Sequence, residues 1–131
     1  VLFPTPAQLA KADPMALKAL GMPVKRAESL IFLAQSVLDG SFPLMPPDDV
    51  EQGVKTLITF PGIGRWTANY YALRGWQAKD VFLADDYLIK QRFAGMTPAQ
   101  TRRYAERWHP WRSYALLHIW YTDGWQPEDV N

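Results

Sequence analysis

The chain has 131 residues, of which 48% are hydrophobic and 14% aromatic, and its formal net charge is +1. This composition argues against intrinsic disorder, and no apolar run approaches the roughly 18 residues of a membrane-spanning helix. Because the chain contains no cysteine, disulfides, thiolate zinc sites, cysteine-held iron–sulfur clusters and a cysteine nucleophile are excluded.

Helix start and stop signals divide the chain into short helical segments. Prolines follow Thr or Asp caps, a pairing typical of a first helical turn, and glycines follow several apolar stretches, as at helix C-termini. Residues 76–85 lack helical periodicity and are expected to form an irregular connector. The expected helices cover residues 5–12, 13–20, 24–39, 50–58 (capped by Asp48 or Asp49), 65–73, 86–93, 98–108 and 112–122.

This pattern contains no strand-like alternation, so the expected fold class is all-α. We expect a compact bundle of about eight short helices in a single helical domain over residues 1–131. The chain begins with Val1 rather than Met, so we also expect it to be a fragment of a larger protein.

Basic residues concentrate in one stretch, where Lys90 to Arg112 contains six Lys and Arg residues against Glu106 alone. Such a stretch is more often a solvated helix face than a binding surface, and nucleic-acid binding is the alternative interpretation.

The segment "FPGIG" lies between two expected helices and places Gly62 two residues before Gly64. Both glycines can adopt positive φ in a tight turn, and the N-terminus of the following helix adds unpaired N–H groups and partial positive charge. The turn is therefore a candidate phosphate-binding site. The alternative is a connection between helices that merely requires glycine.

The wider stretch "LITFPGIGRWTA" resembles the helix-hairpin-helix motif, here at about residues 49–73, and Asp86 follows Trp66 by 20 residues. The stretches "FPGIGRWTANYYALRGWQAKDVFLADDYLIKQRF" and "RSYALLHIWYT" are similar to bacterial DNA-3-methyladenine glycosylases II. These form the alkylation-repair branch of the helix-hairpin-helix DNA glycosylase superfamily. The resemblance covers nearly the whole chain and implies the C-terminal portion of such an enzyme.

The resemblance implies that Asp86 is the catalytic residue. A carboxylate stabilises the positive charge that builds on the sugar as an N-glycosidic bond breaks, and a helix N-terminus favours that negative charge. Asp85 is then expected to cap the helix while Asp86 faces the cleft; the alternative is that both are simply caps. Bifunctional relatives carry a lysine where this chain has Trp66, so a monofunctional enzyme with water as nucleophile is expected.

The aromatic residues suggest the substrate. Rings that face a cleft would stack on an extruded base, and their electron-rich faces prefer cationic alkylated purines such as 3-methyladenine and 7-methylguanine. The alternative is that these rings belong to the core. The candidate base-binding residues are Trp66, Tyr70, Trp120 and Tyr121, and the candidate DNA-binding residues are Gly62, Ile63, Gly64, Arg65 and Thr67.

The resemblance further implies a monovalent cation at the hairpin, bound by the main-chain carbonyls of Ile58, Phe60 and Gly62. No cofactor for catalysis and no iron–sulfur cluster are expected. The expected partner is double-stranded DNA that contains alkylated bases, with no membrane partner and a monomeric protein. A bacterial cytoplasmic, nucleoid-associated location is expected.

Two other functions stay open from the sequence. A non-catalytic helix-hairpin-helix module would grip DNA phosphates, bind in a strongly salt-dependent way and release no base. A helical interaction domain whose glycine turn is structural would show no salt-dependent DNA binding.

Overall fold

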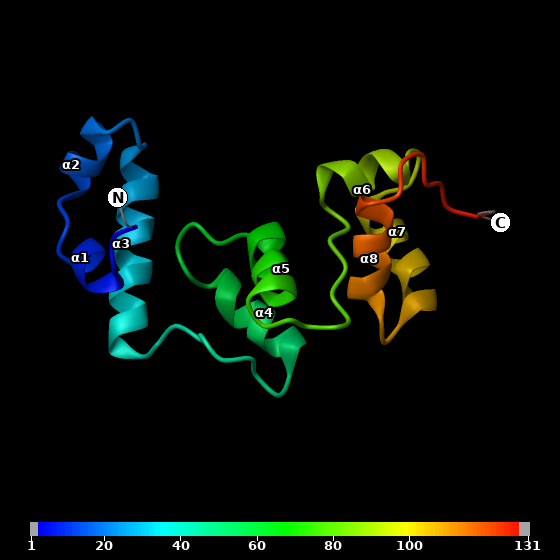
Figure 1. Ribbon diagram of the computed structural model, residues 1–131, viewed down its shortest axis with the longest axis horizontal. Coiled ribbons are helices and arrows are strands. Elements are labelled where there is room, and N and C mark those ends of the chain that lie inside the picture. The colour runs from blue at the N-terminus through cyan, green and yellow to red at the C-terminus, as the bar shows by residue number, and fades with distance from the viewer. Residues whose placement is uncertain (1–2, 129–131) are drawn as a thin grey trace. The chain divides into compact units, whose positions relative to one another are not determined.

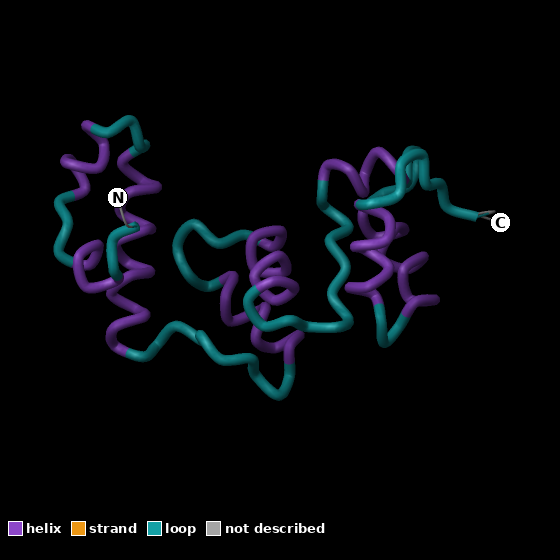
Figure 2. The backbone as a smooth tube through the Cα atoms, viewed as in Figure 1, coloured by secondary structure: helices purple, strands orange, loops and turns teal. Residues whose placement is uncertain are grey.

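The computed structural model describes residues 3–128, which form eight α-helices and one 3-10 helix and contain no strand (Figure 2). The all-α prediction is confirmed, and the helix boundaries agree with the sequence signals to within a few residues. The helices are α1 (Pro6–Ala10), α2 (Pro14–Ala19), α3 (Val24–Asp39), α4 (Val50–Ile58), α5 (Arg65–Arg74), α6 (Tyr87–Arg92), α7 (Pro98–Ala105), η1 (Glu106–Trp108) and α8 (Arg112–Trp120).

The chain divides into two compact units, Val1–Arg65 and Trp66–Asn131, which are described separately. The expectation of a single domain over residues 1–131 stays a prediction. No helix within residues 3–128 has the length and apolar character that crossing a membrane requires.

In the first unit, α1 and α2 pack against α3 (Figure 1). Thr5 forms a full capping box with Gln8 at the start of α1, and Asp13 caps α2 through the amide of Met15. Helix α3 buries Ala27, Ile31 and Ala34, whereas Leu38 in its last turn is exposed.

The loop that leads into α4 packs through aromatic rings of the same unit. Phe60, just after α4, makes edge-to-face contacts with Phe32 of α3 and with Phe42, at centroid distances of 6.3 and 5.4 Å. Of the two candidate caps of α4, Asp49 fills the role by accepting the amide hydrogen of Gln52.

The second unit has a larger core. It contains fully buried Phe93, Ile89, Leu116 and Ile119 from α6, its C-terminal cap and α8. Each such side chain contributes about 1.5–3 kcal/mol of hydrophobic free energy. The core fixes α6 beside α8, the two helices whose ends carry the functional candidates.

The predicted irregular connector is present between α5 and α6, and it is tied to the start of α8. The buried hydroxyl of Ser113 donates to the Ala78 carbonyl at 2.6 Å and accepts the Val81 amide hydrogen at 2.8 Å. Asp80 accepts hydrogen bonds from the backbone amide and the guanidinium of Arg112 at 2.7–3.1 Å.

These anchors explain how Asp86 reaches the other end of α8. The nine residues of α8 rise about 13 Å, and over this stretch the connector continues from Val81 through a turn at Ala84 and Asp85 to Asp86. The connector therefore runs alongside α8 (Figure 1), from its N-terminus at Ser113 to its C-terminus at Trp120.

Candidate active site and glycine turn

Asp86 is the N-cap residue of α6, and its carboxylate accepts the amide hydrogen of Ile89 at 3.3 Å. The expectation that Asp85 caps this helix is wrong. Asp85 instead lies 3.7 Å from the guanidinium of Arg102 on α7. The capping position belongs to the residue whose backbone is still extended just before the first helical residue, which is Asp86 with φ −65° and ψ 140°.

Capping uses only part of the Asp86 carboxylate, because two indole groups also bind it. The Nε1–H of Trp66 donates to Oδ1 at 3.1 Å, and the Nε1–H of Trp120 donates to Oδ2 at 3.2 Å. A carboxylate offers about four acceptor positions, of which three are filled here. About one position remains for a partner from outside the protein, such as a sugar or a water molecule.

Three different elements therefore hold one carboxylate in place. Trp66 lies in the first turn of α5, Asp86 precedes α6, and Trp120 is the last residue of α8. Asp86 and Trp120 are partly buried and Trp66 is 40% exposed, so the group lies at the surface of the second unit rather than inside its core.

The rings beside Asp86 form a continuous cluster. Trp66 and Tyr70 stack nearly parallel, with centroids 4.9 Å apart and an interplanar angle of 12°, and Tyr70 lies 6.4 Å from Trp120 at 40°. A flat base inserted between two rings needs two contact layers of about 3.5 Å each. No base therefore fits between Trp66 and Tyr70, and the wider, tilted gap between Tyr70 and Trp120 is closer to the required spacing.

Tyr121 joins the cluster through Arg74, a residue that the sequence reasoning missed. Hydrogen bonding to the side chain of Tyr121, and secondly to Tyr70, raises the pKa of Arg74 above its ordinary value. The guanidinium carbon lies 5.9 Å from the ring centroids of both Tyr70 and Trp120. The helical spacing of Trp66, Tyr70 and Arg74, four residues apart each time, was the signal that could have identified it.

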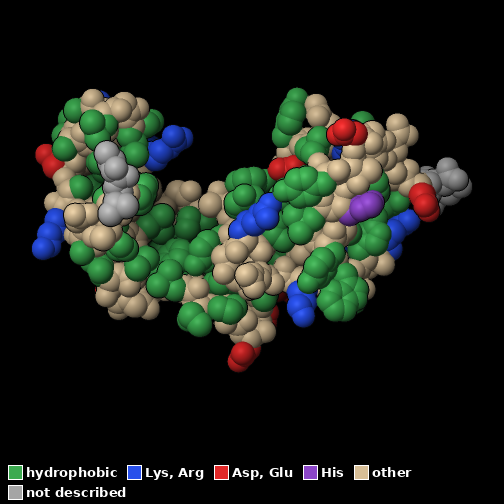
Figure 3. Space-filling view, in the orientation of Figure 1, with side chains coloured by type: hydrophobic (Ala, Val, Ile, Leu, Met, Phe, Trp, Pro, Cys, Tyr) green, Lys and Arg blue, Asp and Glu red, His purple; other side chains and the backbone are tan. Residues whose placement is uncertain are grey.

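Hydrophobic side chains are frequent on the protein surface, with Lys and Arg among them (Figure 3). All four aromatic residues predicted to bind a base are at least partly accessible, and Tyr121 is 77% exposed. The alternative that they are ordinary core residues therefore does not describe them, although Trp120 also packs against the core.

In the glycine turn, the two glycines differ. Gly62 has φ +84°, and a Cβ on it would lie 3.0 Å from the side chain of Ser29, so both conformation and space require glycine there. Gly64, which could also adopt positive φ, does not do so. One left-handed residue suffices to reverse the chain, and Gly64 already leads into α5.

Gly64 has a different property, because a Cβ there would meet no atom of residues 3–128 within 4 Å apart from its two chain neighbours. Its backbone is thus open to approach from outside. The other predicted DNA-binding residues lie nearby in sequence, with Arg65 and Thr67 exposed in the first turn of α5 and Ile63 partly buried.

The three carbonyls proposed to bind a cation lie around the end of α4. The Phe60 carbonyl accepts the amide hydrogen of Ile63 at 3.1 Å, which leaves its second lone pair, and Ile58 and Gly62 are exposed. Within residues 3–128, no group of three or more His, Asp or Glu side chains is arranged to hold a metal ion. Carbonyl oxygens suit a hard cation, so these residues are compatible with one.

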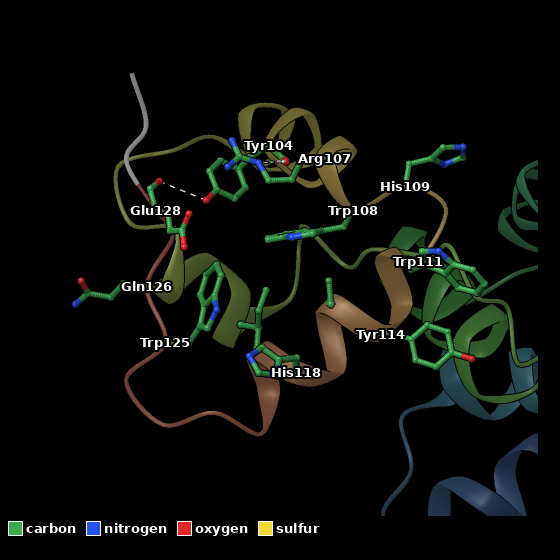
Figure 4. Close-up of a pocket in the computed structure, with 12 residues that line it drawn as sticks. Tyr104, Arg107, Trp108, His109, Trp111, Tyr114, His118, Trp125, Gln126 and Glu128 are labelled. Carbon is green, nitrogen blue, oxygen red and sulfur yellow. Dashed lines mark hydrogen bonds between the residues drawn. The ribbon is translucent and has the colours of Figure 1, made fainter.

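A separate hollow of about 680 Å³ lies between η1, α8 and the C-terminal segment (Figure 4). Tyr104, Trp108 and Trp125 contribute rings to it, and the Tyr104 hydroxyl donates to the Glu128 carbonyl at 3.3 Å. Trp125 also contacts Phe93 of the core, at a centroid distance of 5.4 Å. These contacts attach the C-terminal segment to the unit, and none of the predicted site residues lines the hollow.

Comparison with known proteins identifies the relatives of this chain. No protein-family model matches it. It is 77% identical over 130 residues to DNA-3-methyladenine glycosylase 2 of Escherichia coli, an alignment that covers 99% of this chain and 46% of that protein. It is 35% identical to a probable bifunctional transcriptional activator/DNA repair enzyme AlkA of Mycobacterium tuberculosis, over 97% of this chain and 27% of that protein.

A solved structure has the same fold. The Schizosaccharomyces pombe 3-methyladenine DNA glycosylase Mag1, in complex with abasic DNA, superposes with a TM-score of 0.75 at 24% identity. That superposition covers 90% of this chain and 62% of the Mag1 chain. The chain spans about half the length of the Escherichia coli relative, and its resemblance to the DNA-3-methyladenine glycosylases, indicated by the sequence, is confirmed.

Proposed function

We propose that the chain is part of a monofunctional DNA glycosylase that removes alkylated purines, of the 3-methyladenine and 7-methylguanine type, from double-stranded DNA. The observation that carries the proposal is the Asp86 carboxylate held by two indole N–H groups inside an accessible cluster of rings. The name of the Escherichia coli relative, DNA-3-methyladenine glycosylase 2, supports it.

In this mechanism Asp86 acts on the sugar. When the N-glycosidic bond breaks, its electron pair leaves with the base and positive charge develops on the sugar. A fixed negative charge beside the sugar lowers the energy of that state without reorganisation. Water then adds to the sugar carbon and loses its proton, for which the free acceptor position of Asp86 is available.

The rings favour a cationic base. A purine alkylated at a ring nitrogen carries positive charge, interacts with the faces of Tyr70 and Trp120, and becomes neutral as it leaves. Such a leaving group needs little help from a general acid. The position before Thr67 holds Trp66 in place of a lysine, so no amine is available there to form a covalent intermediate and cut the strand.

The glycine turn is proposed to bind a DNA phosphate. Gly62 shapes the turn, the open backbone at Gly64 admits the phosphate, and the first amides of α5 face it with Arg65 adding charge. A monovalent cation on the carbonyls of Ile58, Phe60 and Gly62 would add positive charge at this turn.

The test compares Asp86→Asn with the parent chain. Asparagine retains the cap on the Ile89 amide and removes the charge, so we expect folding and DNA affinity to persist while base release falls by about a hundredfold or more. Base release is measured by chromatography of free 3-methyladenine and 7-methylguanine from methylated duplex DNA, and affinity by fluorescence anisotropy.

The matched control is Asp85→Asn, which changes the neighbouring carboxylate that faces Arg102. We expect it to keep base release within a fewfold of the parent rate. Equal loss in both variants, or continued release by Asp86→Asn, contradicts the role of Asp86. Salt-dependent DNA binding by the parent without any base release would favour the non-catalytic DNA-binding module.

A further inference from the structure

Arg74 is the positively charged side chain of the ring cluster around Asp86. It follows Tyr70 by one helical turn, and its guanidinium carbon lies 5.9 Å from the centroids of both the Tyr70 and the Trp120 rings. These distances are within the range of about 6 Å in which a cation is attracted to an aromatic face. The same two rings border the gap that comes closest to the spacing a flat base requires.

Two tyrosine side chains influence Arg74. Tyr121 first, and Tyr70 second, raise the pKa of its guanidinium above the ordinary value. Arg74 is exposed and Tyr121 is 77% exposed, so movement of the guanidinium away from the rings requires no unpacking of the core. The geometry thus combines a permanent cation, two ring faces and a side chain that is free to move at the surface.

We propose that Arg74 is a specificity-determining residue, whose guanidinium covers the Tyr70 and Trp120 rings in the free protein and lowers the affinity of this gap for cationic bases. This inference rests on the proposed function, because it takes the rings as the place where the base stacks. A cationic purine must displace a like charge from the same rings, whereas a neutral purine meets no charge repulsion. Arg74 therefore makes the difference in affinity between cationic and neutral purines smaller than the two rings alone would produce.

The size of the effect follows from the exposure of the group. A cation on an aromatic face at an exposed site changes affinity only modestly, by about two- to fivefold. Removal of the charge is thus expected to raise the affinity for a cationic nucleoside about two- to fivefold relative to a neutral one. The absolute affinity of the neutral nucleoside changes less.

The variants separate charge from packing. Arg74→Met keeps the long side chain and removes the charge, whereas Arg74→Lys keeps the charge and is expected to preserve most of the parental ratio. Tyr121→Phe keeps the ring and removes the hydroxyl that raises the pKa of Arg74, so it should shift the ratio in the direction of Arg74→Met but less. The matched control is Arg26→Met, which alters an exposed arginine on α3.

The measurement is a titration of the chain with 7-methylguanosine, in its cationic form in mildly acidic buffer, and with guanosine. The indole N–H signals of Trp66 and Trp120 in nitrogen–proton correlation spectra report binding at the ring cluster itself. The quantity compared is the dissociation constant of guanosine divided by that of 7-methylguanosine, so a higher ratio means a stronger preference for the cationic nucleoside. If Arg74 had only a structural role, its replacement would weaken the binding of both nucleosides equally and leave this ratio unchanged.

A ratio that rises in Arg74→Met, stays near the parent value in Arg74→Lys and does not rise further in Arg74→Met combined with Tyr121→Phe supports the inference. An unchanged ratio in Arg74→Met, or the absence of any indole shift in every chain, overturns it. Base release from methylated DNA by the parent chain is measured beside it. Release together with an unchanged ratio refutes only the role of Arg74, whereas failure of release by the larger enzyme of which the chain is proposed to be part refutes the proposed function.

Discussion

Replacement of Trp120 or Trp66 by phenylalanine removes one indole N–H donor from Asp86 and leaves an aromatic ring in place. In the structure these donors lie 3.2 and 3.1 Å from the two carboxylate oxygens. Loss of the Trp66 donor leaves Oδ1 without its indole partner, and loss of the Trp120 donor leaves Oδ2 with the Ile89 amide alone, so either change holds the carboxylate less firmly. The change should therefore lower both the stability of the cluster and the rate of base release.

The magnitude depends on charge and exposure. A hydrogen bond to an ionised group contributes about 1.5–3 kcal/mol when shielded, and less when water competes. Trp120 is partly buried and packs on the core, so we expect a coupling of about 1.5 kcal/mol with Asp86. Trp66 is 40% exposed, so its coupling is expected to be about 1 kcal/mol or less.

The assay is a double-mutant cycle with Asp86→Ser, which retains an N-cap hydroxyl and is too short to bind both indoles. Urea unfolding followed by circular dichroism gives the free energy of unfolding of each variant, and losses of ring area cancel in the cycle. Only the part of this interaction that strengthens as positive charge develops on the sugar changes the rate, so we expect Trp120→Phe to slow base release by up to about tenfold and Trp66→Phe by up to about fivefold. Coupling energies below about 0.3 kcal/mol for both pairs would refute the inference that the indoles hold the carboxylate.

The two glycines of the turn should respond differently to alanine. Gly62→Ala places a Cβ on a left-handed residue, 3.0 Å from a neighbouring side chain, and should lower the free energy of unfolding by about 1–2 kcal/mol or more. Gly64→Ala should leave the free energy of unfolding nearly unchanged and weaken DNA binding in an anisotropy titration. Destabilisation by Gly64→Ala would contradict this reading. Acid should weaken the connector, because hydrogen bonding from Arg112 lowers the pKa of Asp80 from 3.8 to about 2. The stability that this carboxylate contributes is complete above about pH 4 and is lost as the pH falls through about 2. It amounts to on the order of 1 kcal/mol after solvent screening. Asp80→Asn should remove that part of the pH dependence in acid-unfolding curves.

Helix positions were predictable because their signals are local. Thr5, Asp13 and Thr97 are each followed by proline, and in the structure each caps a helix that begins at that proline. A cap acts within one turn, between a side-chain oxygen and an amide two or three residues later, so sequence alone specifies it. The same holds for the left-handed residue at Gly40, which ends α3.

The errors of sequence reasoning concern choices between adjacent or equivalent residues. Both Asp85 and Asp86 are plausible caps by type, and only the backbone angles assign the cap to Asp86. Gly64 could adopt positive φ but is not required to, since Gly62 alone makes the turn. Arg74 was missed although it lies on the same helical stripe as Trp66 and Tyr70, because a basic residue at a helix C-terminus is unremarkable by itself.

The sequence by itself determined the all-α class, the order of the helices and the residue types that carry the chemistry. The helices follow from hydrophobic periodicity, capping residues and glycines, which act over a few residues of the chain. Tertiary structure decided that the carboxylate of Asp86 is shared by Trp66 and Trp120, which lie 20 residues before and 34 residues after it. That arrangement depends on the connector anchored at Ser113 and on the burial of α8 against α6, which are long-range contacts. No local rule specifies them, because their free energy comes from packing between segments that meet only in the folded chain.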